Sequence, residues 1–290
     1  MSVDLAQALG YEFDPVEISY SEKDVSLYGL SIGAASDPID VEGLKFVYEL
    51  NGAGFYAFPT YAVTFPFSFF WEITNVPGLK FNPMMLLHGE QYLELKRPLS
   101  TSATITNYGR ISNIYDKGSG ALVVTEVVSK NEAGEEVAFN QSSAFIRGIG
   151  GFGGERGPSS KINLPPDRDP DAIVEETTEP NQALIYRLAS GDGNPLHADP
   201  RMAAIGGFDR PILHGLCTFG FAARAVLREC ADNDPARFKS IRVRFSKHFF
   251  PGETVITEMW RESDSKVIFQ TKVKERDELV LTNAAMELWE

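Results

Sequence analysis

Residues 186–197 read Tyr-Arg-Leu-Ala-Ser-Gly-Asp-Gly-Asn-Pro-Leu-His, and residues 211–220 read Pro-Ile-Leu-His-Gly-Leu-Cys-Thr-Phe-Gly. In the first stretch, Asn194 and Pro195 stand between an acid, Asp192, and an imidazole, His197. Proline fixes its own φ and disfavours helical conformation in the residue before it, so this segment is a rigid bend. A bend can turn Asp192 and His197 toward one point, where both could exchange protons with one water molecule. Taken alone, the same residues also fit an exposed surface turn.

The second stretch opens the clearest helix of the chain. Apolar residues recur there at helical spacing, at Leu213, Leu216, Phe219, Ala223, Val226, Leu227 and Cys230, before Asp232-Asn-Asp-Pro235 ends the pattern. Gly215 falls in the first turn, where backbone N–H groups have no partner within the helix and the helix dipole is positive. With no side chain, Gly215 allows either a ligand oxygen or a neighbouring sheet to approach closely.

The rest of the chain reads as two related halves. We predict a helix at 22–35, a strand or extended segment at 44–50, and further strands at 91–96, 103–108, 121–129 and 136–147. Residues 28–34, 91–98 and 140–145 parallel residues 186–192, 242–251 and 283–288, which indicates an internal repeat. Each half is a helix with an antiparallel meander, so we predict an α+β double hotdog whose first-half helix is degenerate.

The repeat sets the expected domain organisation. We expect residues 1–150 to form a first hotdog without a counterpart of the Asp192–His197 pair, 151–171 to form a Gly- and Pro-rich linker, and 172–290 to form a second hotdog that contains this pair. The aromatic run at 55–71, broken by Pro59 and Pro66, fits either core packing or the wall of an apolar tunnel.

Composition excludes several classes of protein. The apolar fraction of 43% and the charged fraction of 23% are those of a packed globular protein, and no apolar run approaches the length of a membrane span. The net charge of −13 argues against general nucleic-acid binding, although local cations can still hold an anionic substrate. A zinc site needs three or four ligands, and the bend offers a single imidazole beside Asp192 and Asp199, so we expect no metal.

The bend and its surroundings resemble the signature of the hydratase 2 family, the MaoC-like (R)-specific 2-enoyl-CoA hydratases. The matching residues are Tyr186, Gly191, Asp192, Asn194, Pro195, His197 and the run 207–220. Residues 87–95, 116–120, 150–154 and 258–260 also resemble the hydratase domain of the peroxisomal multifunctional enzyme type 2 of β-oxidation. The resemblance covers most of the chain in register.

The resemblance implies a set of functional residues. Asp192 and His197 would form the catalytic pair, Asn194 would orient the pair or the water, and Gly215 would supply the oxyanion-hole amide. Contacts to the acyl-CoA substrate would come from His88, Gly89, Lys117, Gly193, Pro195, Leu196 and Phe245. No cofactor is expected.

We therefore expect hydration of trans-2-enoyl-CoA to (3R)-3-hydroxyacyl-CoA in fatty-acid β-oxidation. The order of roles within the Asp192–His197 pair stays open. The resemblance also implies a homodimer and a peroxisomal location, although the chain carries no C-terminal Ser-Lys-Leu. Two other functions fit a hotdog: an acyl-CoA thioesterase, which needs a carboxylate but has no evident need for His197, and a non-catalytic acyl-CoA-binding module.

Overall fold

A computed structural model describes residues 2–158 and 162–289. Its main feature is one ten-stranded sheet in the order β2-β5-β6-β7-β4-β9-β12-β11-β10-β8, in which all neighbours are antiparallel. The first five strands are β2 (Val16–Tyr20), β5 (Ala103–Asp116), β6 (Gly120–Asn131), β7 (Glu136–Arg147) and β4 (Leu86–Leu95). The other five are β9 (Phe238–Phe245), β12 (Glu278–Leu288), β11 (Lys266–Val273), β10 (Thr254–Ser263) and β8 (Ala172–Thr177). A separate two-stranded sheet pairs β1 (Ser2–Val3) with β3 (Leu79–Lys80).

Short and long helices cover the sheet. The α-helices are α1 (Leu5–Ala8), α2 (Glu22–Ser31), α3 (Phe67–Glu72), α4 (Gln182–Ser190), α5 (Pro200–Ile205) and α6 (Gly215–Cys230). The 3-10 helices are η1 (Leu44–Phe46), η2 (Pro59–Thr64), η3 (Ile73–Asn75), η4 (Pro83–Met85), η5 (Pro195–His197) and η6 (Pro235–Arg237).

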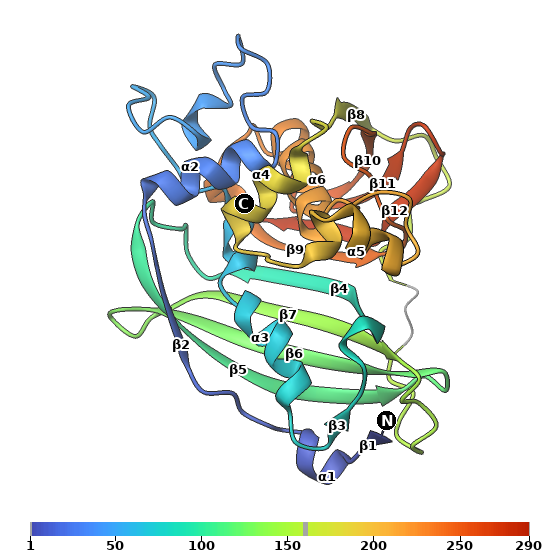
Figure 1. Ribbon diagram of the computed structural model, residues 1–290. Coiled ribbons are helices and arrows are strands. Elements are labelled where there is room, and N and C mark those ends of the chain that lie inside the picture. The colour runs from blue at the N-terminus through green and yellow to red at the C-terminus, as the bar shows by residue number, and fades with distance from the viewer. Residues whose placement is uncertain (1, 159–161, 290) are drawn as a thin grey trace.

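The two halves of the chain meet at the β4–β9 pair, in the middle of the sheet (Figure 1). Glu90 pairs there with Arg244, and Glu94 pairs with Ser240. On the helical side α2 and α4 lie next to each other, and Gln182 of α4 donates to the carbonyl of Ser31 at 2.6 Å. Each half is thus an antiparallel sheet with helices on its inner face, which confirms the predicted α+β double hotdog.

The long helix of the second half is α6. It packs against β9, β10, β11 and β12, and nearly all of its residues are buried, as expected for a helix enclosed by a curved sheet. A Cβ added at Gly220 would lie 2.4 Å from Ile32, so this glycine lets α6 approach the segment after α2. The predicted end is confirmed, because Asp232 and Asn233 both have positive φ just beyond Cys230.

The first half has no counterpart of α6 among its described residues. The corresponding space holds the short helices η2, α3 and η3; α3 lies over β5–β7 in Figure 1, whereas η2 contacts β4 and α6. Phe69 of α3 packs against Phe13 and belongs to a second apolar core beneath α1 and α3. The aromatic run therefore does both of the expected things: Phe58, Tyr61 and Phe65 are buried in the core, and Phe67, Phe70 and Trp71 line a cavity. Phe69 is buried and also contributes to the cavity wall.

The prediction of a strand or extended segment at 44–50 was wrong. Residues 44–46 form η1, and turns follow in which Asn51 bonds back to Tyr48 and its side chain reaches the carbonyl of Gly54. Phe46 is buried while Tyr48 and Leu50 are exposed. Most of this segment is apolar, but Gly43 precedes it and Asn51-Gly52 follows it, and it pairs with no strand among the described residues, so the chain turns there instead of extending. Within the described residues, no helix is long and apolar enough to cross a membrane.

Candidate active site

The predicted bend is built from two turns in which a side chain caps the backbone. Helix α4 ends at Ser190, and Gly191 reverses the chain with a left-handed φ of 75°, a conformation that favours glycine. The carboxylate oxygen Oδ1 of Asp192 then accepts the Asn194 N–H at 2.9 Å, and the Asn194 side chain accepts the Leu196 N–H at 3.1 Å. These bonds start η5 and fix the direction of His197.

One ring nitrogen of His197 forms a hydrogen bond, and the other has no hydrogen-bond partner among the described residues. Its Nδ1 lies 2.8 Å from the carbonyl oxygen of Ile212, which can only accept, so Nδ1 carries the proton. The lone pair of Nε2 is therefore available toward the cavity. Asp192 is arranged in the same way, with Oδ1 held by Asn194 and Oδ2 left free of a hydrogen bond to the described residues.

A third residue joins the pair that the sequence predicted. His214, the N-cap residue of α6, stacks on His197 with ring centroids 3.8 Å apart, and its Nε2 lies 3.9 Å from Asp192 Oδ2. Asp192, His197 and His214 each place one ligating atom within 4.8 Å of the others. They form a group of metal-ligating residue types, but the same atoms are the ones that proton transfer would use, and we assign no metal to them. Sequence reasoning missed His214, whose only signal was its place one residue before Gly215.

Burial governs the protonation of this cluster. It raises the pKa of the Asp192 carboxyl, against the lowering effects of the Asn194 N–H and of His197. Burial lowers the pKa of His197 and lowers that of His214 to about 2. Both imidazoles are therefore neutral near pH 7. A neutral imidazole beside a carboxylate whose pKa is raised can exchange a proton through one water.

Gly215 presents an unused donor beside this cluster. It is the first residue of α6, and no described residue accepts a hydrogen bond from its N–H. The residue is exposed to the cavity, and a Cβ built on it would lie 2.9 Å from Phe245. The backbone there has room for a ligand oxygen but not for a side chain, which is the geometry of an oxyanion donor.

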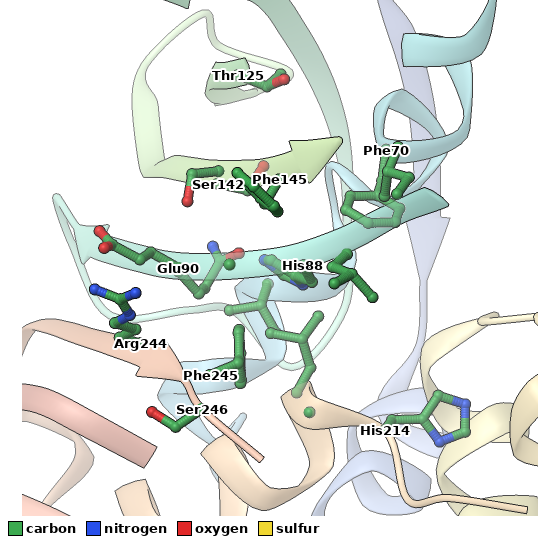
Figure 2. Close-up of a pocket in the computed structure, with 18 of the residues that line it drawn as sticks. Phe70, His88, Glu90, Thr125, Ser142, Phe145, His214, Arg244, Phe245 and Ser246 are labelled. Carbon is green, nitrogen blue, oxygen red and sulfur yellow. The ribbon is translucent and has the colours of Figure 1, made fainter. Parts of the chain in front are cut away.

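The cluster opens into a cavity of about 970 Å³ between the two halves. Figure 2 shows His88 of β4 between Phe70 and Phe245, with ring centroids 5.2 Å and 4.7 Å away. Its neighbour Gly89 lies at a bulge, where the register of β4 with β7 shifts between His88 and Glu90. Bulges often occur beside active sites because they redirect a side chain.

The remaining predicted substrate contacts divide into two groups. Leu196 and Lys117 line the cavity, and the Lys117 ammonium donates to the carbonyl of Arg156 near the Tyr115 ring. Gly193 and Pro195 are exposed and do not line the cavity. Cavity-lining residues that the sequence did not point to include Thr125, Ser142, Phe145, Arg244 and Ser246 (Figure 2).

Comparison with known proteins matches both halves. Residues 18–148 match the model of the MFE-2 hydratase 2 N-terminal domain, and residues 161–284 match that of the MaoC like domain. A Dictyostelium discoideum protein named "Probable enoyl-CoA hydratase 2" is 46% identical, with 98% of this chain and 96% of that protein covered. The mouse "Peroxisomal multifunctional enzyme type 2" is also 46% identical, but the match covers 97% of this chain and 38% of that protein.

A solved structure agrees with the sequence matches. The crystal structure of a MaoC-like dehydratase from Phytophthora capsici has a TM-score of 0.88 and 38% identity, and 99% of each chain is covered. The sequence resemblance noted above is thereby confirmed across both halves. With its MFE-2-type N-terminal half and its MaoC-like C-terminal half, the chain belongs to the hydratase 2 family.

Proposed function

We propose that this chain is an (R)-specific enoyl-CoA hydratase, a hydro-lyase that reversibly converts trans-2-enoyl-CoA to (3R)-3-hydroxyacyl-CoA in fatty-acid β-oxidation. One observation supports this most directly. One cavity is bordered by the residues that carry three groups without a hydrogen-bond partner among the described residues. These groups are Asp192 Oδ2, His197 Nε2 and the Gly215 N–H. The names of the relatives, enoyl-CoA hydratase 2 and peroxisomal multifunctional enzyme type 2, point to the same reaction.

The reaction needs no group beyond these residues. The thioester oxygen accepts the Gly215 N–H, which stabilises negative charge drawn from the C2–C3 double bond. Water bound between Asp192 and His197 forms a bond to C3 as the π bond breaks, and the electrons pass to the thioester oxygen. The Asp192–His197 pair accepts the proton that the water loses and returns that proton to C2, so the hydroxyl at C3 and the new hydrogen at C2 both come from one water. Asn194 holds Asp192 through its backbone and thus orients the pair.

The cavity also suggests how the acyl-CoA lies. We propose that residues 1–150 bind the acyl tail along Phe67, Phe70 and Trp71, in the space that a long first-half helix would fill. Residues 172–290 carry the catalytic groups, and 151–171 join the two. His88, Gly89 and Phe245 lie where the halves meet and would contact the substrate between tail and thioester. Lys117 at the cavity wall would meet the polar part of the CoA.

Incubation with crotonyl-CoA tests the reaction. Loss of the enoyl absorbance without release of free thiol, followed by chiral identification of a 3R product, is the expected result. Release of thiol would instead indicate the thioesterase, and binding with neither change would indicate the non-catalytic module. A 3S product would contradict the proposed stereochemistry.

Two further proposals follow from family membership. We infer a homodimer, which analytical ultracentrifugation of the purified chain would test. We also infer a peroxisomal location, supported by the name of the mouse relative. Fractionation of source cells should recover the hydratase activity with peroxisomal markers, and recovery in the soluble cytosolic fraction would contradict this location.

A further inference from the structure

His214 is buried in a way that its packing alone does not explain. Its side chain is 2% exposed, and its ring lies between His197 and Tyr186, whose ring centroid is 5.0 Å away. Neither ring nitrogen has a hydrogen-bond partner among the described residues. A buried polar group without a partner is rare, and such groups commonly mark a role in the site or a missing ligand. An apolar residue would fill the same space without leaving a polar group unpaired.

Two acceptors near the ring belong to Asp192 of the catalytic pair, namely its backbone carbonyl and its carboxylate. Asp192 Oδ2 lies 3.9 Å from His214 Nε2, while its other oxygen already accepts the Asn194 N–H. A shift of about 1 Å would bring the nitrogen and the oxygen to hydrogen-bonding distance. His197 needs a support as well, because its bond to Ile212 fixes the ring at one nitrogen only. The stacked His214 ring supplies a second constraint on the plane of His197.

We propose that His214 is a positioning residue of the hydration reaction proposed above: it donates Nε2–H to Asp192 Oδ2 and keeps the His197 ring aligned by stacking. The proposal rests on the proposed function for its catalytic consequence. Burial keeps the pKa of His214 low, so the ring stays neutral and retains one N–H to donate. The carboxylate of Asp192 would then be held at both oxygens, and His197 would keep Nε2 directed at the water.

The surroundings of Asp192 define how the effect can be measured. The titratable and charged groups around its carboxyl are His197, His214, Tyr186 and Arg187. A donor to the ionised carboxylate lowers its pKa, so loss of the His214 donor should raise it. The acid limb of log kcat/KM against pH should move to higher pH by the same amount.

Two substitutions separate donation from packing. His214→Phe keeps a planar ring but removes both nitrogens, whereas His214→Gln places an amide N–H near the position of Nε2. We expect His214→Phe to lower kcat for crotonyl-CoA about 10- to 100-fold with little change in KM, and to move the acid limb to higher pH. His214→Gln should return the acid limb toward that of the wild type, with only partial recovery of kcat because the stacking is lost.

A control and a second readout make the outcome decisive. His248 packs against Phe208 and Phe250, lines another part of the same cavity and is more exposed than His214, and its change to Phe should leave the acid limb in place. Carbon-13 NMR titration of the Asp192 carboxyl gives the same comparison in the folded protein without turnover, so it holds even if crotonyl-CoA is not hydrated. An Asp192 pKa that is equal in the wild type and in His214→Phe, or equal acid limbs for the Phe and Gln variants, would overturn the proposal.

Discussion

The oxyanion donor assigned to Gly215 can be tested by two substitutions at one position. Alanine and proline both add a Cβ, but only proline removes the N–H. Proline is well suited to this position, because it is favoured at the first residue of a helix. The preceding residue, His214, already has φ −61° and ψ 134°, which is the extended conformation that a following proline requires. The pair therefore separates a steric effect from loss of the donor.

The structure sets the size of each effect. A Cβ at position 215 would lie 2.9 Å and 3.0 Å from two ring atoms of Phe245, so the ring must move by about half an ångström to reach ordinary contact. Phe245 is partly exposed to the cavity and can give way in that direction. We expect Gly215→Ala to lower kcat/KM by about tenfold or less, since a misplacement of 1 Å can cost 10²-fold. Gly215→Pro should lower kcat by a further factor of about 10²–10³, the typical effect of losing one oxyanion donor.

The assay is the decrease of enoyl absorbance with crotonyl-CoA at saturating and subsaturating concentrations. Thermal unfolding of both variants controls for damage to α6. The double variant Gly215→Ala with Phe245→Leu should recover part of the alanine effect, because a smaller side chain relieves the contact. If Gly215→Pro and Gly215→Ala have the same kcat, the Gly215 amide is not the oxyanion donor.

Three further predictions concern other parts of the molecule. Asp192→Asn and His197→Gln should each lower kcat by about 10²–10⁴, and the double variant should be hardly slower than either, whereas multiplied losses would show that the pair does not act as a unit. The free energy of unfolding should fall as pH drops below about 6.5, because burial lowers the pKa of His214 to about 2 and that of His88 to about 4, so both bind protons only in the unfolded chain. Each histidine should add about 1.4 kcal/mol per pH unit to the pH dependence of the unfolding free energy, down to its folded-state pKa. Urea unfolding of His88→Phe at several pH values should show a pH dependence that is weaker by the contribution of one histidine. Calorimetry should find one acyl-CoA per chain, with affinity rising by about 0.8 kcal/mol per added CH₂ until the cavity is filled, and two equivalent sites or activity confined to C4 would contradict the tail-binding role of the first half.

Local patterns were sufficient for some of the regular elements. The spacing of apolar residues from Leu213 to Cys230 predicted α6 and its end, because a helix enclosed by a sheet needs apolar residues around most of its circumference. The Val-, Ile- and Phe-rich stretches 121–129 and 136–147 likewise predicted β6 and β7. The prediction for 44–50 was wrong because an apolar run carries no information about whether a partner strand exists.

The bend was also readable from its residues. Gly191, Asn194 and Pro195 restrict the backbone through their own conformational preferences and through hydrogen bonds to neighbouring residues. The resulting turns need no partner from a distant part of the chain. The family resemblance then indicated which side chains in the bend carry the chemistry. That part of the site lies within a few consecutive residues, so residues that are close in the sequence are also close in space.

The tertiary structure decided the rest of the site. His214 meets Asp192 and His197 only because α6 begins beside the bend, and Phe245 meets Gly215 and His88 only because β9 pairs with β4. The cavity is lined by residues of both halves, including residues of α3, β4, α6 and β9. These features depend on contacts between residues far apart in the chain, and such contacts are selected by the packing of the whole molecule, which no local pattern of residue types encodes.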